Sequence, residues 1–165
     1  MRDFQDTPKE YEEKIIALDR VTRVVKGGRR FRFRATVVVG NGKGSVGVGV
    51  GKGGDAPTSI VKAVATAKKS LINFPLVNNT IPHQVQVRSD GAVVFMKPAA
   101  PGTGVIAGGT VRSILEVAGV KDILTKSLGS SNKINNAYAT IEALQSLQTD
   151  SLKTTTVVNK EVKTS

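Results

Sequence analysis

The residues most able to do chemistry in this 165-residue chain are cations concentrated in one short stretch. Between Asp19 and Asp55 the sequence holds no carboxylate. Glycine is frequent in the same stretch, and a glycine lets another molecule lie close to the main chain. A surface of one sign on a glycine-rich backbone predicts a long polyanion as partner, above all RNA. The basic side chains of the stretch are Arg20, Arg23, Lys26, Arg29, Arg30, Arg32, Arg34, Lys43 and Lys52.

Composition narrows the class of protein further. The formal net charge of +11 favours nucleic acid as the first candidate partner and an anionic membrane as the second. No apolar run approaches the roughly 18–20 residues that span a bilayer, and no signal-peptide core follows Met1. Cysteine is absent and His83 is the single histidine, which excludes thiolate and multi-histidine metal sites. We expect no cofactor, no metal, no membrane contact and no homo-oligomer, and we interpret His83 as a turn residue.

Three glycine-rich patterns invite comparison with nucleotide-binding loops. Segments 42–47 and 49–54 formally match G-x-G-x-x-G, but neither has the strand, the helix and the later acidic residue that a dinucleotide site requires. Neither segment supplies the Lys-Ser or Lys-Thr pair of a Walker A loop. Residues 98–105 resemble the phosphate loop of the small-molecule kinase superfamily that includes galactokinase and homoserine kinase. A small phosphotransferase using residues 102–109 is therefore an alternative, although carboxylates near this loop are sparse.

The cations must be positioned by the strands that carry them. Residues 13–25 are rich in Ile, Val, Leu and Thr and predict a strand. Residues 40–44, which include the Asn41-Gly42 pair that tight turns favour, predict a hairpin connection, and alternate glycines over 45–51 predict the close approach of another backbone. Alternation over 30–39 divides that strand into two faces, one with Phe31, Phe33, Ala35, Val37 and Val39, the other with Arg30, Arg32, Arg34, Thr36 and Val38. Because the phenylalanines share a face with valines, we expect them in a core in preference to stacking on RNA bases.

A helix is predicted after this sheet, with Asp55 as its cap and an apolar stripe that covers one sheet face. Lys62 and Lys69 share its outer face because they are seven residues apart. The first unit is thus a three-stranded antiparallel sheet with one helix. The residues expected to contact RNA are Arg20, Arg23, Lys26, Gly27, Gly28, Arg29, Arg30, Arg32, Arg34, Lys43, Lys52, Lys62 and Lys69.

Residues 75–82, with two prolines and two asparagines, predict a linker to a second unit. The fold class is therefore α+β, in two small domains at 12–74 and 83–148. We expect flexible ends at residues 1–11 and 149–165. The expected elements of the second unit are a hairpin of strands 84–88 and 92–97, a loop over 98–109, a helix capped by Thr110 and ended by Gly119, a strand over 122–128 and a helix opened by Asn132.

Several blocks of this sequence, in the same order, resemble small-subunit ribosomal protein five of bacterial type. The resemblance covers roughly residues 12–148. Each block alone is weak, but the series is specific. The blocks are Val24-Val25-Lys26-Gly27-Gly28-Arg29-Arg30-Phe31, Val39-Gly40-Asn41-Gly42-Lys43-Gly44, Val48-Gly49-Val50-Gly51-Lys52, Gly102-Thr103-Gly104-Val105-Ile106-Ala107-Gly108-Gly109, Leu115-Glu116-Val117-Ala118-Gly119-Val120 and Gly129-Ser130-Ser131-Asn132.

The resemblance implies a double-stranded-RNA-binding-like first domain and a second α/β sandwich with a left-handed βαβ crossover. It implies a structural, non-enzymatic role on small-subunit rRNA in a cytoplasmic or organellar ribosome, where the protein holds head against body. Residues 20–30 would lie by rRNA near the spectinomycin site and the side where mRNA enters. Small-subunit protein eight would contact the second domain. Protein four would lie near a segment linked in the family to translational accuracy, with Thr103, Gly104, Gly108, Gly109 and Arg112 as interface residues.

The chain departs from the family pattern at Gly53-Gly54-Asp55-Ala56, which replaces the basic and acidic residues often found there. The tail after Thr149 shows no family match. A second function that the sequence leaves open is a free-standing RNA-binding module outside the ribosome.

Overall fold

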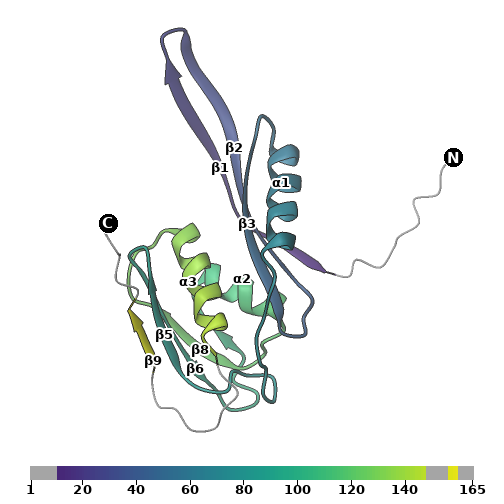
Figure 1. Cartoon of the computed structure of the whole chain (residues 1–165), viewed down its shortest axis with the longest axis vertical. Helices are drawn as coiled ribbons and strands as arrows, with labels where there is room; N and C mark the ends of the chain where they lie inside the picture. Colours follow the sequence, from purple (N-terminus) through teal and green to yellow (C-terminus); the bar gives the residue numbers. More distant parts are fainter. Residues whose placement is uncertain (1–10, 148–155, 160–165) are drawn as a thin grey trace, which may run out of the picture.

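The protein, described here by a computed structural model over residues 11–147 and 156–159, folds into two units that pack together (Figure 1). The described residues confirm the predicted α+β class. The N-terminal unit contains β1 (Glu12–Val25), β2 (Gly28–Gly40), β3 (Ser45–Gly53), α1 (Ala56–Lys69) and β4 (Ile72–Asn73). The C-terminal unit contains β5 (Val85–Ser89), β6 (Ala92–Pro98), β7 (Val105–Ile106), α2 (Gly109–Ala118), β8 (Ile123–Ser127), α3 (Lys133–Gln145) and β9 (Thr156–Asn159).

The N-terminal sheet has the strand order β1-β2-β3-β4, so the short β4 extends the three predicted strands. Helix α1 packs on the face where β3 carries its glycines. A side chain added at Gly49 would meet the carbonyl oxygen of Ala63 and the amide nitrogen of Ala67, both in α1. The glycine column therefore brings helix backbone against strand backbone, as the sequence predicted, and Ala35, Val37 and Val39 complete a small core there.

The opposite face of this sheet is covered by the C-terminal unit. Val38, Val46 and Val48 belong to the same buried cluster as residues of α2, α3, β5 and β6. The loop between β2 and β3 also joins the units, because the N–H groups of Gly42 and Gly44 donate to the carbonyl oxygens of Val117 and Ala118 (3.1 and 3.0 Å). These carbonyls lie at the C-terminal end of α2, where they have no partner within the helix.

In the described C-terminal sheet the strand order is β7-β8-β6-β5-β9. The β5–β6 turn uses Asp90 and Gly91, both at positive φ, at the predicted position. The segment β7-α2-β8 is a βαβ unit whose parallel strands are neighbours. Its left hand is an expectation carried by the family resemblance. Asn132 begins α3 as predicted, with its side-chain oxygen accepting from the Ile134 N–H (3.0 Å).

One local expectation, the Thr110 cap, was wrong, and the structure adds detail to three others. Thr110 lies inside the first turn of α2, whose N-cap is Gly108, and Asp55 caps α1 by position without a side-chain hydrogen bond. The predicted linker is packed: Ile81 is buried, and the Asn79 carbonyl accepts from the Lys121 N–H (2.9 Å). Within the expected flexible tail, Thr156–Asn159 pairs with β5 as a parallel strand, and residues 1–10, 148–155 and 160–165 lie outside the described residues.

Among the described residues, no helix is long and apolar enough to cross a membrane.

Candidate nucleic-acid interface

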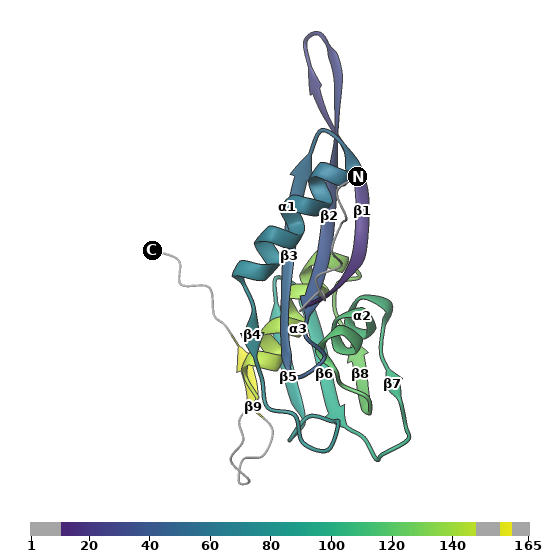
Figure 2. The ribbon, with the colours of Figure 1, turned by 90° about the vertical axis from the view of Figure 1, so that its right-hand side faces the viewer.

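The far end of the β1–β2 ribbon projects beyond α1 and the rest of both units (Figure 1, Figure 2). Strands β1 and β2 pair from Glu12↔Gly40 to Val25↔Gly28, whereas β3 pairs with β2 only as far as Phe33. Residues 20–32, here called the ribbon tip, are therefore a two-stranded ladder over which the described part of the chain places no further layer. All six tip cations are exposed: Arg20, Arg23, Lys26, Arg29, Arg30 and Arg32.

Strand register places like charges against each other on one face of the ribbon. Arg23 lies directly opposite Arg30, and Arg34 lies opposite both Asp19 and Lys52. Directly opposed like charges destabilise a β-ladder. The Arg34 guanidinium donates to the Asp19 carboxylate (3.0 Å), so the local carboxylate is already engaged. We call Arg23, Arg30, Arg32 and Arg34 the arginine face. Of these, Arg23, Arg30 and Arg32 are exposed and form no ion pair with a described residue.

The other face of the tip corrects the expectation for the phenylalanines. Phe31 is 47% exposed, and the Arg20 guanidinium carbon lies 3.8 Å from the centre of its ring. Phe33 is half-buried. The prediction of a core failed because α1 covers Ala35, Val37 and Val39 but does not extend over the tip (Figure 2). One ring face of Phe31 is therefore occupied by a cation–π contact, which is compatible with a surface role.

The nine cations of the opening stretch do not form one surface. Lys43 lies in the β2–β3 loop, at the opposite end of β2 from the tip and about 40 Å away at the usual rise of a strand. Lys52 is exposed beside Arg34, near the base of the tip. Lys62 and Lys69 are exposed on the outer side of α1, as predicted. The structure therefore concentrates the cations at the tip and disperses the others.

The loop predicted to contact another protein is held in shape by a buried carboxylate. Asp122 is 7% exposed, and its Oδ1 accepts from the N–H groups of Gly102 (3.0 Å) and Gly104 (2.9 Å). Both glycines have positive φ, which suits a loop wrapped around one oxygen. The amides that would cradle a phosphate are thus already satisfied by Asp122. Of the other expected interface residues, Gly108, Gly109 and Arg112 are exposed at the start of α2, and Thr103 is exposed in the loop before β7.

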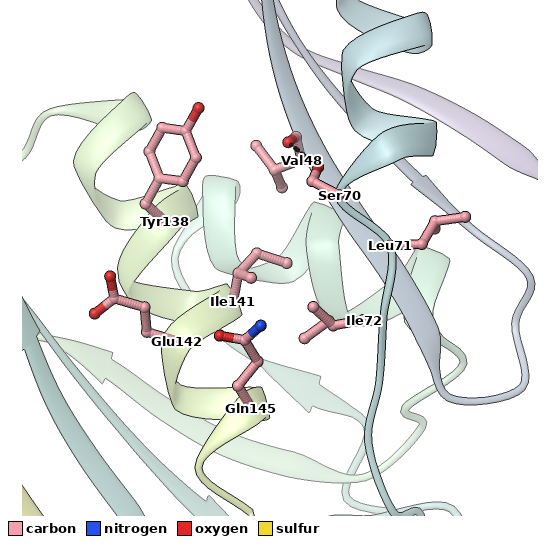
Figure 3. Close-up of a pocket in the computed structure, with 8 residues that line it drawn as sticks. All are labelled: Val48, Ser70, Leu71, Ile72, Tyr138, Ile141, Glu142 and Gln145. Atoms are coloured by element: carbon pink, nitrogen blue, oxygen red, sulfur yellow. Dashed lines mark hydrogen bonds between the residues drawn. The ribbon is translucent and has the colours of Figure 1, made fainter.

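A pocket of about 400 Å³ lies between the two units, lined by α3 on one side and by β3 with the end of α1 on the other (Figure 3). The Ser70 hydroxyl is engaged with backbone carbonyls, including that of Val48 at 2.9 Å. The lining, all of it in described residues, holds no histidine, lysine or arginine that could activate a nucleophile. Its residues are Val48, Ser70, Leu71, Ile72, Tyr138, Ile141, Glu142 and Gln145.

Two family models match this chain. The model for the N-terminal domain of ribosomal protein S5 matches residues 11–75, and the model for its C-terminal domain matches residues 87–155. The two matches together cover most of the sequence and fall on the two structural units in order. Members of this family are structural, non-enzymatic proteins of the small ribosomal subunit, where they bind rRNA and other ribosomal proteins. The chain belongs to the ribosomal protein S5 family.

Proposed function

We propose that the ribbon tip is the main rRNA contact of this ribosomal protein, with the arginine face set against phosphates. The main support for the proposal is the direct opposition of Arg23 and Arg30 on a ladder that no described element covers. Such an arrangement is unfavourable in the free protein and becomes favourable once an anion lies between the two guanidiniums. A phosphate backbone supplies anions at regular spacing along such a projection.

The test is the salt dependence of rRNA binding by the full chain. With four to six phosphate contacts, log affinity should fall with log salt at a slope of about −3 to −5. Arg30→Glu with Arg32→Glu should lower affinity at least about 100-fold at low salt and make the slope shallower by about 2. A matched control is Lys121→Glu with Lys133→Glu, which changes the net charge equally at exposed positions of the C-terminal unit.

Equal slopes for the tip variant and the control variant would contradict the proposal. Co-sedimentation with small subunits through a moderate salt wash separates a ribosomal component from a free-standing RNA-binding module.

We propose further that the exposed residues from Thr103 to Arg112 contact small-subunit protein four and contribute to translational accuracy. The support is a continuous series of contacts between this region and the N-terminal unit. Asp122 holds the loop that precedes β7 and α2, and the C-terminal end of α2 accepts hydrogen bonds from Gly42 and Gly44 in the β2–β3 loop. These contacts would let the protein stabilise the head of the small subunit relative to its body. Contacts of the C-terminal unit with protein eight, and a position near the side where mRNA enters, belong to the same proposal.

Arg112→Glu tests the proposed contact with protein four without straining the backbone, since Arg112 is exposed on the first turn of α2. We expect weaker capture of protein four by the full chain, together with unchanged affinity for rRNA. The charge-matched control is Lys121→Glu. Loss of rRNA binding by Arg112→Glu, or unchanged capture of protein four, would contradict the proposal that the N-terminal unit binds rRNA and the C-terminal unit binds protein four.

A phosphotransferase using residues 102–109 is not supported, because Asp122 occupies two of the loop amides. A carboxylate in that position would also repel an incoming phosphate.

A further inference from the structure

The C-terminal sheet has one face that no described element covers. Its inner face carries Val85, Val94 and Met96, which are buried in the common core. Helix α3 contacts β5 and β6 on that inner side and also contacts β3 and β4 of the N-terminal sheet, so it lies between the two sheets. The outer face is therefore a second open sheet surface, separate from the ribbon tip.

An aromatic side chain lies in the middle of cations on this outer face. Phe95 on β6 is directly opposite Lys126 on β8 and directly opposite Gln86 on β5. Lys97 is two residues along the same strand, and Arg88 is diagonal to Phe95 across β5, two residues beyond Gln86. Residues in these positions point to the same side of a sheet and lie within reach of one another. Phe95 is half-buried, whereas Arg88, Lys97 and Lys126 are exposed.

Charge and apolar area on this surface point to one kind of occupant. None of the three cations forms an ion pair with a described residue, and the facing positions on β5, β6, β7 and β8 carry no carboxylate. Beside the cations, Ile106 and Leu124 are paired across β7 and β8 and are 50% and 38% exposed. A sheet that presents an aromatic ring, apolar side chains and unpaired cations suits unstacked bases whose phosphates follow the cations.

We propose that this surface, here called the Phe95 face (Arg88, Phe95, Lys97 and Lys126), binds a single-stranded stretch of RNA. The proposal goes beyond the tip contact, because it concerns the other unit and a ligand whose bases are accessible. A base stacks on the exposed part of Phe95 while Lys97, Lys126 and Arg88 neutralise the flanking phosphates. Duplex RNA does not fit this role, since its bases are already stacked on each other.

The experiment compares full-length variants for binding to a 12-nucleotide uridine oligomer and to a 16-base-pair RNA duplex. Lys97→Glu with Lys126→Glu should lower affinity for the oligomer at least about tenfold and reduce the salt slope by about 1.4, as expected for two lost phosphate contacts on a single strand. Phe95→Leu should lower it about fivefold or more through lost stacking. The control, Lys121→Glu with Lys133→Glu, should leave oligomer binding nearly unchanged, and thermal unfolding should show that every variant folds.

The Arg30→Glu/Arg32→Glu background keeps the two proposals apart. Binding of the oligomer that survives in this background and disappears when Lys97→Glu and Lys126→Glu are added supports the Phe95 face, whatever the tip does. Oligomer affinity equal to that of the control pair overturns the inference and leaves the tip proposal untouched. Unchanged RNA affinity combined with poorer incorporation into small subunits also overturns it, because the face would then hold a protein neighbour.

Discussion

The two ends of the β1–β2 ribbon have the same strands and opposite surroundings. At the base, Ala35–Gly40 of β2 is buried on both faces, by α1 on one side and by the C-terminal unit on the other. At the tip, residues 28–32 are exposed on both faces. Strand alternation alone therefore does not decide burial, which depends on whether another layer reaches that part of the strand.

The comparison also explains how a charged tip stays ordered. An isolated two-stranded hairpin is at best marginally stable in water, and opposed arginines weaken it further. Here the same two strands continue into a core on both faces, so the buried base orders the exposed tip. This arrangement suits the proposed rRNA contact, because the base anchors the ribbon and the tip presents cations far from the core.

The largest expected difference between the two ends comes from glycine. Gly49→Val should destabilise the protein by about 3 kcal/mol or more, because its side chain would meet α1 backbone atoms that cannot rotate away. The added methyl group of Gly27→Ala at the tip meets no atom of the described residues within 4 Å, and the change should alter the free energy of unfolding by less than about 0.5 kcal/mol. Urea unfolding of both variants measures this. Similar losses of stability in both variants would contradict the difference in packing between base and tip.

A smaller difference is expected from a single chemical change made at both ends. Val38→Ala removes a fully buried side chain from the core between the units and should cost about 2 kcal/mol. Val24→Ala removes a side chain that is 73% exposed and should stay within about 0.5 kcal/mol of the parent. Thermal and urea unfolding give both values. If Val24→Ala proved the more damaging change, the tip would not be the uncovered end.

The smallest effect on stability carries the most information about function, because stability and RNA binding should move in opposite directions. Arg23→Glu places a carboxylate opposite Arg30 and should stabilise the free protein by about 0.5 kcal/mol. The same change should weaken rRNA binding, since it removes a phosphate contact and repels the backbone. Unfolding and RNA titrations on one preparation measure both. Tighter RNA binding by Arg23→Glu would contradict the role assigned to the arginine face.

Much of the fold follows from local sequence signals. Alternation over 30–39, the Asn41-Gly42 turn, the glycine column of β3 and the Asn132 cap each specify local geometry, and each lies where it was expected. Signals that depend on distant partners were missed. Thr36 and Val38 share a strand face with Arg30, Arg32 and Arg34, but both are buried, and Val38 packs in the core shared with the C-terminal unit. No local pattern reveals which unit will cover which end of a strand.

The candidate site was predictable in part for the same reason. The cations at the tip lie close in sequence, so their types and spacing located them. Asp19 becomes the partner of Arg34 only through strand register, and Asp122 reaches the Gly102–Gly104 loop only through the βαβ unit. Alternation of Val93, Phe95 and Lys97 against the buried Val94 and Met96 was the signal that could have indicated the outer face of β6.

The most direct test of the central claim is a density map of this protein in its assembled small subunit, read at the ribbon tip. We expect phosphate oxygens of rRNA within about 3 Å of the guanidiniums of Arg23, Arg30 and Arg32. A tip surrounded by solvent, with rRNA contacting other parts of the protein, would contradict it.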